Sequence, residues 1–292
     1  MLVDRDRADV TLTLPDGRAL GYAEYGDPAG APGFYFHGHP GSRFEAELAD
    51  EPARERGLRV IALDRPGYGR SDARPGRTIL DWPSDVAQAA DALGIGAFSV
   101  LGASGGGPYA LACGYALPER ITKAGVMSGV GPYSAPGATA GMRWQNRLGF
   151  QLGARVPFIA RLIMRSMERQ VHRNPARVVD AVALAMSESD AEIVRRPEVR
   201  AWLTRDLTEA FRQGAAGPTA DVVLLGGRWG FEPRDVRVPV LLWQGEADML
   251  VPPAMGRYMA EQIPNCRARF FTGEGHLLAV THIAEVLDEF RA

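Results

Sequence analysis

Cysteine is scarce in this sequence, and its scarcity excludes a fold held together by disulfides. Only Cys113 and Cys266 occur in 292 residues, and two cysteines do not make a disulfide framework. Cys113 lies in an apolar run of helical character, which indicates a small buried hydrophobic residue. Lysine is scarcer still, because Lys123 is the single lysine among 33 basic residues. A Walker-type phosphate loop, which ends in Gly-Lys-Ser or Gly-Lys-Thr, is therefore excluded.

Long apolar runs are also missing. No stretch of 18 apolar residues occurs, and residues 1–10 are charged and lack an apolar core of signal-peptide length, so we expect no membrane span and a cytoplasmic location. A net charge of −2 gives no reason to expect a nucleic-acid partner. No G-x-G-x-x-G motif indicates a cofactor. A small-molecule substrate is the expected partner, and the sequence leaves monomer and homodimer open.

What is present is an alternation of strand and helix patterns. A hairpin is predicted where residues 10–14 and 19–25 flank the turn Pro15-Asp16-Gly17. Short apolar strands separated by helices favour a mostly parallel sheet covered on both faces, an α/β fold. The predicted strands are 34–36, 59–63, 98–101, 121–127, 238–243 and 267–271, and the predicted helices are 44–56, 79–93, 109–117 and 277–291.

The alternation stops at about residue 131 and resumes after about residue 217. Between these points the apolar spacing is helical and no strand pattern appears. We therefore predict a core domain formed by residues 1–130 and 218–292, with residues 131–217 inserted as a helical cap. The insertion carries 13 arginines against eight acidic residues. Solvated helix faces account for this charge, and a basic lid that favours anionic or acyl substrates is the alternative.

The pattern Gly102-Ala103-Ser104-Gly105-Gly106 lies between a predicted strand and a predicted helix. A G-x-S-x-G sequence in this context is typical of a nucleophile elbow, a turn so sharp that side chains two residues either side of the serine would collide. Ser104 is then an exposed nucleophile. The alternatives are an ordinary glycine-rich loop and a phosphate site at the helix N-terminus.

A serine nucleophile needs a base and a third group that orients the base. His276 follows the strand 267–271 and precedes the last helix, so it is the predicted base; His282 within that helix and His172 in the insertion are less suited. Asp248 follows the strand 238–243 and is the predicted acid, with Glu246 on the same loop as the alternative.

An oxyanion requires N–H donors that are already in place. The Gly105 N–H, just after the nucleophile, is one predicted donor. The second is the backbone N–H of His39, in the sequence His37-Gly38-His39-Pro40-Gly41 that follows an early strand. His37 and His39 as metal ligands are the competing interpretation, but two histidines without a third ligand make a poor zinc site. No metal is expected.

Together these blocks, and the sequence Asp64 to Asp72, resemble the α/β-hydrolase fold family, over roughly residues 10–130 and 218–292. The resemblance implies an eight-stranded sheet, a helical cap and the order serine, acid, histidine. It is nearest to the branch of carboxylesterases and proline-iminopeptidase-like enzymes. Aspartate-nucleophile dehalogenases and epoxide hydrolases are excluded by Ser104. The usual peptidase elbow, Gly-Gly-Ser-Trp-Gly, differs from this one. The block from Asp64 to Asp72 is expected to be a structural turn.

The expected function is cleavage of a small-to-medium carboxylic ester through an acyl-enzyme. Apolar side chains of the cap are the expected pocket: Trp144, Phe158, Leu162 and Met167. The same triad also fits a thioesterase, lactonase, perhydrolase, acyltransferase, aminopeptidase-like enzyme or carbon–carbon bond hydrolase. A small-molecule receptor of the same fold, without turnover, is the non-enzymatic alternative.

Overall fold

An eight-stranded sheet is the centre of the computed structural model, which describes residues 7, 9–142 and 144–290. The strand order is β1-β2-β4-β3-β5-β6-β7-β8. β2 pairs antiparallel with β1 and β4, and the other neighbours pair in parallel. The strands are β1 (Val10–Thr13), β2 (Ala19–Gly26), β3 (Ala31–Phe36), β4 (Leu58–Leu63), β5 (Phe98–Ala103), β6 (Ile121–Met127), β7 (Val240–Gly245) and β8 (Cys266–Phe271). The predicted mostly parallel sheet is confirmed.

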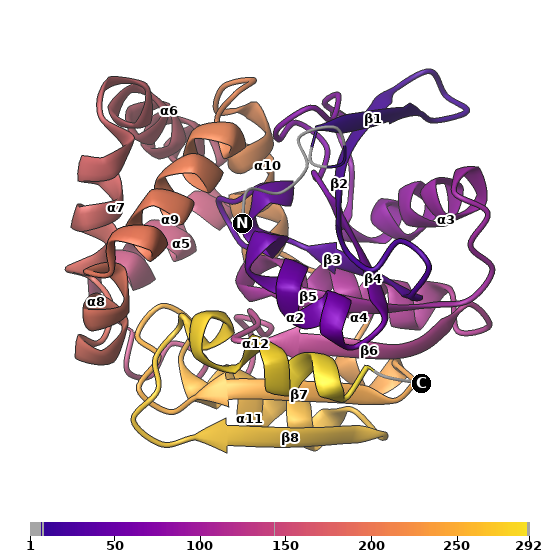
Figure 1. The fold of residues 1–292 in the computed structure, drawn as a ribbon. Coiled ribbons are helices and arrows are strands. Elements are labelled where there is room, and N and C mark those ends of the chain that lie inside the picture. Colours follow the sequence, from indigo (N-terminus) through magenta and orange to yellow (C-terminus); the bar gives the residue numbers. More distant parts are fainter. Residues whose placement is uncertain (1–6, 8, 143, 291–292) are drawn as a thin grey trace.

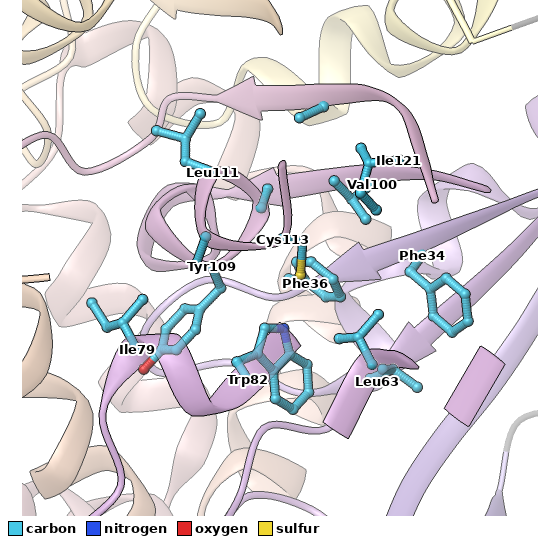
Figure 2. Close-up of a cluster of buried hydrophobic side chains, with 14 of the residues drawn as sticks. Phe34, Phe36, Leu63, Ile79, Trp82, Val100, Tyr109, Leu111, Cys113 and Ile121 are labelled. Carbon is cyan, nitrogen blue, oxygen red and sulfur yellow. The ribbon is translucent and has the colours of Figure 1, made fainter. Parts of the chain in front are cut away.

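Helices cover both faces of the sheet because its strands are apolar on both sides. In β3, Phe34 and Phe36 enter one hydrophobic cluster while Tyr35 between them enters the other. Figure 2 shows the first cluster, where Phe36 meets Trp82 edge to face, with ring centroids 5.4 Å apart. This face is covered by α3 (Trp82–Ala92), α4 (Gly107–Ala116) and α11 (Pro253–Gln262), and the other by η1 (Arg43–Ala49), α2 (Asp50–Glu55) and α12 (Leu278–Asp288).

Between β6 and β7 the chain forms helices alone, which we call the α5–α10 segment. Figure 1 shows most of these helices gathered at the left, on the side toward which the arrows of β7 and β8 point. They enclose a separate hydrophobic cluster that includes Met164, Val179 and Leu207. The helices are α5 (Trp144–Arg155), α6 (Pro157–Arg173), α7 (Pro175–Ala183), α8 (Glu188–Val194), α9 (Pro197–Ala210) and α10 (Ala216–Gly226).

Two helices differ from the sequence-based expectation. α10 runs through residue 217, where the insertion was expected to end, and its residues enter both the segment's cluster and the core, with Val222 in one and Leu225 in the other. α11, which begins at Pro253 directly after its N-cap Pro252, was not predicted. The division into a core and an inserted cap stays a prediction. In the ranges that the structure describes, no helix is both long and apolar enough to cross a membrane.

Candidate active site

The elbow after β5 holds Ser104 in a strained backbone conformation. Ser104 has a φ of +50°, in the left-handed region that non-glycine residues rarely adopt. A Cβ on Gly102 would overlap the carbonyl of Gly106, and a Cβ on Gly106 would overlap the carbonyl of Phe36. Glycine at 102 and 106 is therefore a steric requirement of this turn, as the G-x-S-x-G pattern predicts. The turn continues through the short helix η3 (Ser104–Gly106) into α4.

Three side chains from distant parts of the sequence form one hydrogen-bond chain. His276 Nε2 lies 3.0 Å from Ser104 Oγ, and His276 Nδ1 lies 2.8 Å from Asp248 Oδ2. The three residues follow β5, β7 and β8, whose carboxyl ends share one edge of the sheet. The structure thus brings together the serine, histidine and aspartate that the sequence nominates.

The carboxylate of Asp248 accepts hydrogen bonds from its own loop and from the strand before it. Its Oδ1 accepts the N–H groups of Leu250 and Val251, each at 2.9 Å, and its Oδ2 accepts from Gln244 Nε2 at 3.1 Å. Glu246, the alternative acid, instead binds Arg257 and a threonine at the surface. The geometry therefore favours Asp248 over Glu246.

The pKa of His276 reflects its acidic surroundings. Burial lowers the pKa of this imidazole, but the carboxylates of Asp248, Asp190 and Glu45 outweigh burial, so the net shift is upward. A ring in this environment accepts a proton from Ser104 more readily than a free histidine, because the imidazolium it becomes is stabilised. His172 and His282 are not among the residues that line the cavity at Ser104.

The second predicted oxyanion donor lies beside the elbow. A Cβ on Gly105 would sit 3.2 Å from the backbone nitrogen of His39, so the two stretches of backbone are in contact. Within the described chain, the His39 N–H donates to no acceptor. It stays the predicted partner of the Gly105 N–H for an oxyanion.

Of the histidine side chains of this loop, His37 is buried and His39 is half-buried, and both are neutral. Burial lowers the pKa of His39 to about 4 and the pKa of His37 well below its usual value. His37 Nε2 accepts the Arg65 N–H at 3.1 Å, and His39 Nδ1 lies 2.9 Å from the Tyr68 hydroxyl. Among the described residues, no three His, Cys, Asp or Glu side chains are grouped so that they could hold a metal ion.

Arg65 holds the loop of His37 and His39 in place. Its guanidinium donates to the carbonyl oxygens of His37 and Gly38, and it pairs with Asp221 of α10 at 2.8 Å. Asp221 also accepts from Arg77 at 2.5 Å, and neither carboxylate oxygen is exposed to solvent. The block from Asp64 to Asp72 was expected to be a structural turn without chemistry; through Arg65 it also supports the candidate oxyanion loop.

A cavity of about 170 Å³ opens at Ser104. A similar volume holds a benzene ring in an engineered protein, so the cavity has room for a group of about that size. Met167 lines it, as expected. Most of its apolar lining comes from the α5–α10 segment: Met167, Val179, Val182, Met186, Val194, Trp202, Leu203 and Leu207.

The expectation is wrong for the other three predicted pocket residues. Trp144, Phe158 and Leu162 are 69%, 66% and 52% exposed, and none lines the cavity. Helical spacing shows that apolar residues share a face of a helix, but it does not show which face meets the active site.

Two acidic side chains in the cavity were not predicted. Glu45 Oε2 accepts the Gly38 N–H at 2.7 Å, and Asp206 Oδ1 accepts from the Ser42 hydroxyl at 2.6 Å. Burial and the nearby Glu45 raise the pKa of Asp206 well above its usual value. A Cβ on Gly41 would lie 2.7 Å from Glu45 Oε2 and 3.3 Å from Asp206 Oδ2, so these oxygens face one small volume. No motif in the sequence marks either residue.

Asp190 of α8 was also missed. Its carboxylate accepts the backbone N–H groups of His276 and Leu277, at 2.9 Å and 2.8 Å. The spacing Ser187-x-x-Asp190 is a helix-start pattern, and Ser187 indeed caps α8. The pattern locates the helix but gives no sign that the aspartate reaches the loop of His276.

Comparison with known proteins shows the family of this chain. A family model described as the alpha/beta hydrolase fold matches residues 34–283. The chain belongs to the α/β hydrolase fold family. An α/β hydrolase fold protein from Nakamurella multipartita superimposes with a TM-score of 0.72 and 22% identity, covering 97% of this chain and 99% of that one. An esterase from Exiguobacterium antarcticum gives 0.70 and 19%, with the same coverage. These similarities show the hydrolase fold alone.

Sequence relatives of this α/β hydrolase include enzymes of different activities. A proline iminopeptidase of Lactobacillus delbrueckii subsp. bulgaricus is 27% identical over 268 residues, which is 85% of this chain and 84% of that enzyme. A non-heme chloroperoxidase of Streptomyces lividans is 35% identical over 120 residues, 40% of this chain and 44% of that protein. The family is shared, while the reaction differs between the relatives.

Proposed function

We propose that this α/β hydrolase is a serine hydrolase that cleaves a carboxylic ester through an acyl-enzyme. The observation that carries the proposal is the continuous hydrogen-bond chain from Ser104 through His276 to Asp248. Ser104 Oγ attacks the ester carbonyl while His276 Nε2 takes its proton. The imidazolium, held by Asp248, then protonates the departing alcohol. Water activated by the same imidazole releases the acid and restores Ser104.

The tetrahedral intermediates carry a negative oxygen that needs stabilisation. The N–H groups of His39 and Gly105 are the proposed donors, because the two backbones touch beside Ser104. Loss of one such donor in other enzymes costs roughly 10²–10³ in kcat. The network of Arg65 and Asp221 holds this loop in place before substrate arrives, which is the condition for such stabilisation.

The α5–α10 segment acts as the cap over the site in this proposal. Its side chains form most of the apolar wall of the cavity, so the acyl group would be recognised there. A volume of about 170 Å³ favours acyl chains of short to medium length over long ones.

The test is turnover of p-nitrophenyl esters from acetate to octanoate by the purified protein and its S104A variant. We expect turnover by the wild type, best at short or medium chain length, and a loss of at least about 10³-fold in S104A. Equal rates in the two proteins would contradict a serine nucleophile. A wild type that binds esters without turnover would favour the receptor alternative.

The paired acids of the cavity favour a second candidate, an aminopeptidase-like hydrolase. In a cavity whose walls are mostly apolar, Glu45 and Asp206 form no ion pair among the residues that the structure describes. An ammonium group on the acyl side of a substrate would let both carboxyl groups ionise. The proline iminopeptidase relative is consistent with this chemistry.

A matched pair of substrates separates the two candidates. An amino-acid p-nitrophenyl ester with a free amine is compared with its N-acetylated form, using wild type and D206N. The aminopeptidase-like candidate predicts a preference for the free amine that D206N abolishes. Equal kcat/KM for the two esters would favour the simple esterase over the aminopeptidase-like hydrolase.

A further inference from the structure

Asp190 is a carboxylate enclosed where the α5–α10 segment meets the loop that carries His276. It is 0% exposed, and its Oδ2 accepts the Ser187 hydroxyl at 2.7 Å. In the described part of the chain, no arginine, lysine or histidine side chain pairs with it. Burying a carboxylate without a cation is unfavourable unless hydrogen bonds replace its hydration. Its remaining hydrogen bonds therefore take the place of a cation.

Those bonds go to two consecutive amides of the other element. The N–H of His276 donates to Asp190 Oδ2 at 2.9 Å, and the N–H of Leu277 donates to Oδ1 at 2.8 Å. Leu277 is the N-cap of α12, so the carboxylate also lies at the positive end of that helix. Gly275 leaves room for the contact, because a Cβ there would overlap Asp190 Oδ2.

Packing reinforces the same junction. The side chain of Leu277 packs against the hydrophobic cluster of the α5–α10 segment, which includes Val194 of α8, and Leu203 of α9 packs against the same cluster. Val194 and Leu203 also line the cavity at Ser104. The backbone that carries the histidine is thus attached to the helices that would enclose the substrate, by two hydrogen bonds and by apolar contact.

We propose that Asp190 is a positioning residue: from the α5–α10 segment it holds the backbone of His276 so that the imidazole faces Ser104. Asp248 alone fixes only the ring, through Nδ1. With the backbone also held, the ring has a single orientation between its two partners. This role rests on the proposed function, in which His276 is the general base. It also implies that displacement of α8 from the core would release the base.

The charge of Asp190 gives the proposed role a measurable effect on the pKa of His276. The groups that face His276 are Ser104 on the elbow, Asp248 after β7, Glu45 on η1 and Asp190 on α8. The three carboxylates favour the imidazolium. Removal of the Asp190 charge therefore lowers the pKa of His276, in addition to loosening its backbone.

The experiment compares wild type with D190N, D190A and the control D180N. Asp180 lies on α7 of the same segment, but it is exposed and paired with Arg200 at the surface. Two measurements are made: kcat and KM for a p-nitrophenyl ester across pH, and the pKa of His276 by NMR of the labelled imidazole.

We expect kcat to fall about 10–100-fold in D190A, with KM changed by less than about threefold, since a misplaced base slows chemistry more than binding. D190N, which keeps one carbonyl acceptor, should retain more activity than D190A. In both variants the pKa of His276 and the acid limb of kcat/KM should move to lower pH. D180N should match wild type in every measurement.

A folded D190A with the wild-type kcat and the wild-type His276 pKa would overturn the proposal. It would equally be overturned if kcat fell only in proportion to the folded fraction while the pKa stayed in place. If D190A does not fold, the pKa shift in D190N decides. A wild type that is inactive on esters would count against the proposed function. The effect of Asp190 on His276 would still be tested, because the NMR measurement of the His276 pKa requires no turnover.

Discussion

Asp221 offers the sharpest test of how the candidate site is held. Its carboxylate is 0% exposed and accepts from Arg65 and Arg77, and from the hydroxyl groups of Tyr68 and Tyr109 at 2.9 Å and 2.6 Å. The substitution Asp221→Asn keeps the shape of the side chain and removes the charge. Two buried guanidinium groups then face each other without their shared counter-ion, and loss of one partner from a buried pair costs about 3–5 kcal/mol.

The size of the thermal effect follows from the length of the chain. The entropy of unfolding is about 2.1 cal/mol/K per residue, which for 292 residues is about 0.6 kcal/mol/K. A loss of 3–5 kcal/mol then lowers Tm by about 5–8 °C. The matched control is Asp91→Asn, whose carboxylate is 69% exposed and pairs with Arg120. That variant should lose less than about 1 kcal/mol, or about 2 °C.

The low pKa of Asp221 determines how the loss of stability in Asp221→Asn depends on pH. Burial raises the pKa of Asp221, but Arg65 and Arg77 outweigh it and hold the pKa well below its usual range. The stabilisation by Asp221 is therefore present above the unfolded-state pKa of about 3.9 and is lost as pH falls through the lower folded-state pKa. The Tm difference between wild type and Asp221→Asn should be constant from pH 6 to 8. A difference no larger than the control's would refute the counter-ion role.

Three further predictions concern the candidate site itself. Asp248→Asn should lower kcat by roughly 10²–10⁴, whereas Glu246→Gln, at a surface carboxylate, should change it by less than about threefold; a larger effect of Glu246→Gln would reverse the choice of acid. Because the pKa of His276 is raised above its usual 6.5, kcat/KM should be low in acid and rise with pH, with a midpoint above 6.5. A midpoint below 6.5 would contradict the effect of the surrounding carboxylates on the ring. Gly106→Ala should yield little folded protein, measured as soluble yield and Tm, because its Cβ would overlap the Phe36 carbonyl; a variant of wild-type Tm would show that the elbow relaxes.

The parts of the site that the sequence predicts are those that depend on local constraints. Glycine at 102 and 106 is demanded by the turn itself, so the elbow is visible in five residues. Asp248 and His276 follow apolar strands, and parallel strands bring their carboxyl ends to one edge of the sheet. Position relative to a strand was therefore enough to nominate His276 as the base and to place the acid on the loop that holds Asp248 and Glu246.

The parts that the sequence does not predict depend on long-range packing. Asp190 and His276 are 86 positions apart in the sequence, and the periodicity of a short helix does not indicate that they are in contact. Glu45 and Asp206 approach each other only because η1 and α9 pack together. For the same reason Trp144 was expected in the cavity and lies on the surface instead.

The central claim is that Ser104 is a nucleophile activated by its neighbours. A fluorophosphonate probe reacts with an activated serine and leaves a covalent phosphonyl group, which mass spectrometry locates by peptide. The account predicts one label on the Gly102–Tyr109 region of the wild type, at Ser104, none in S104A, and labelling at least about 10²-fold slower without the base in His276→Ala. An unlabelled wild type, or a label on a different residue, would contradict it.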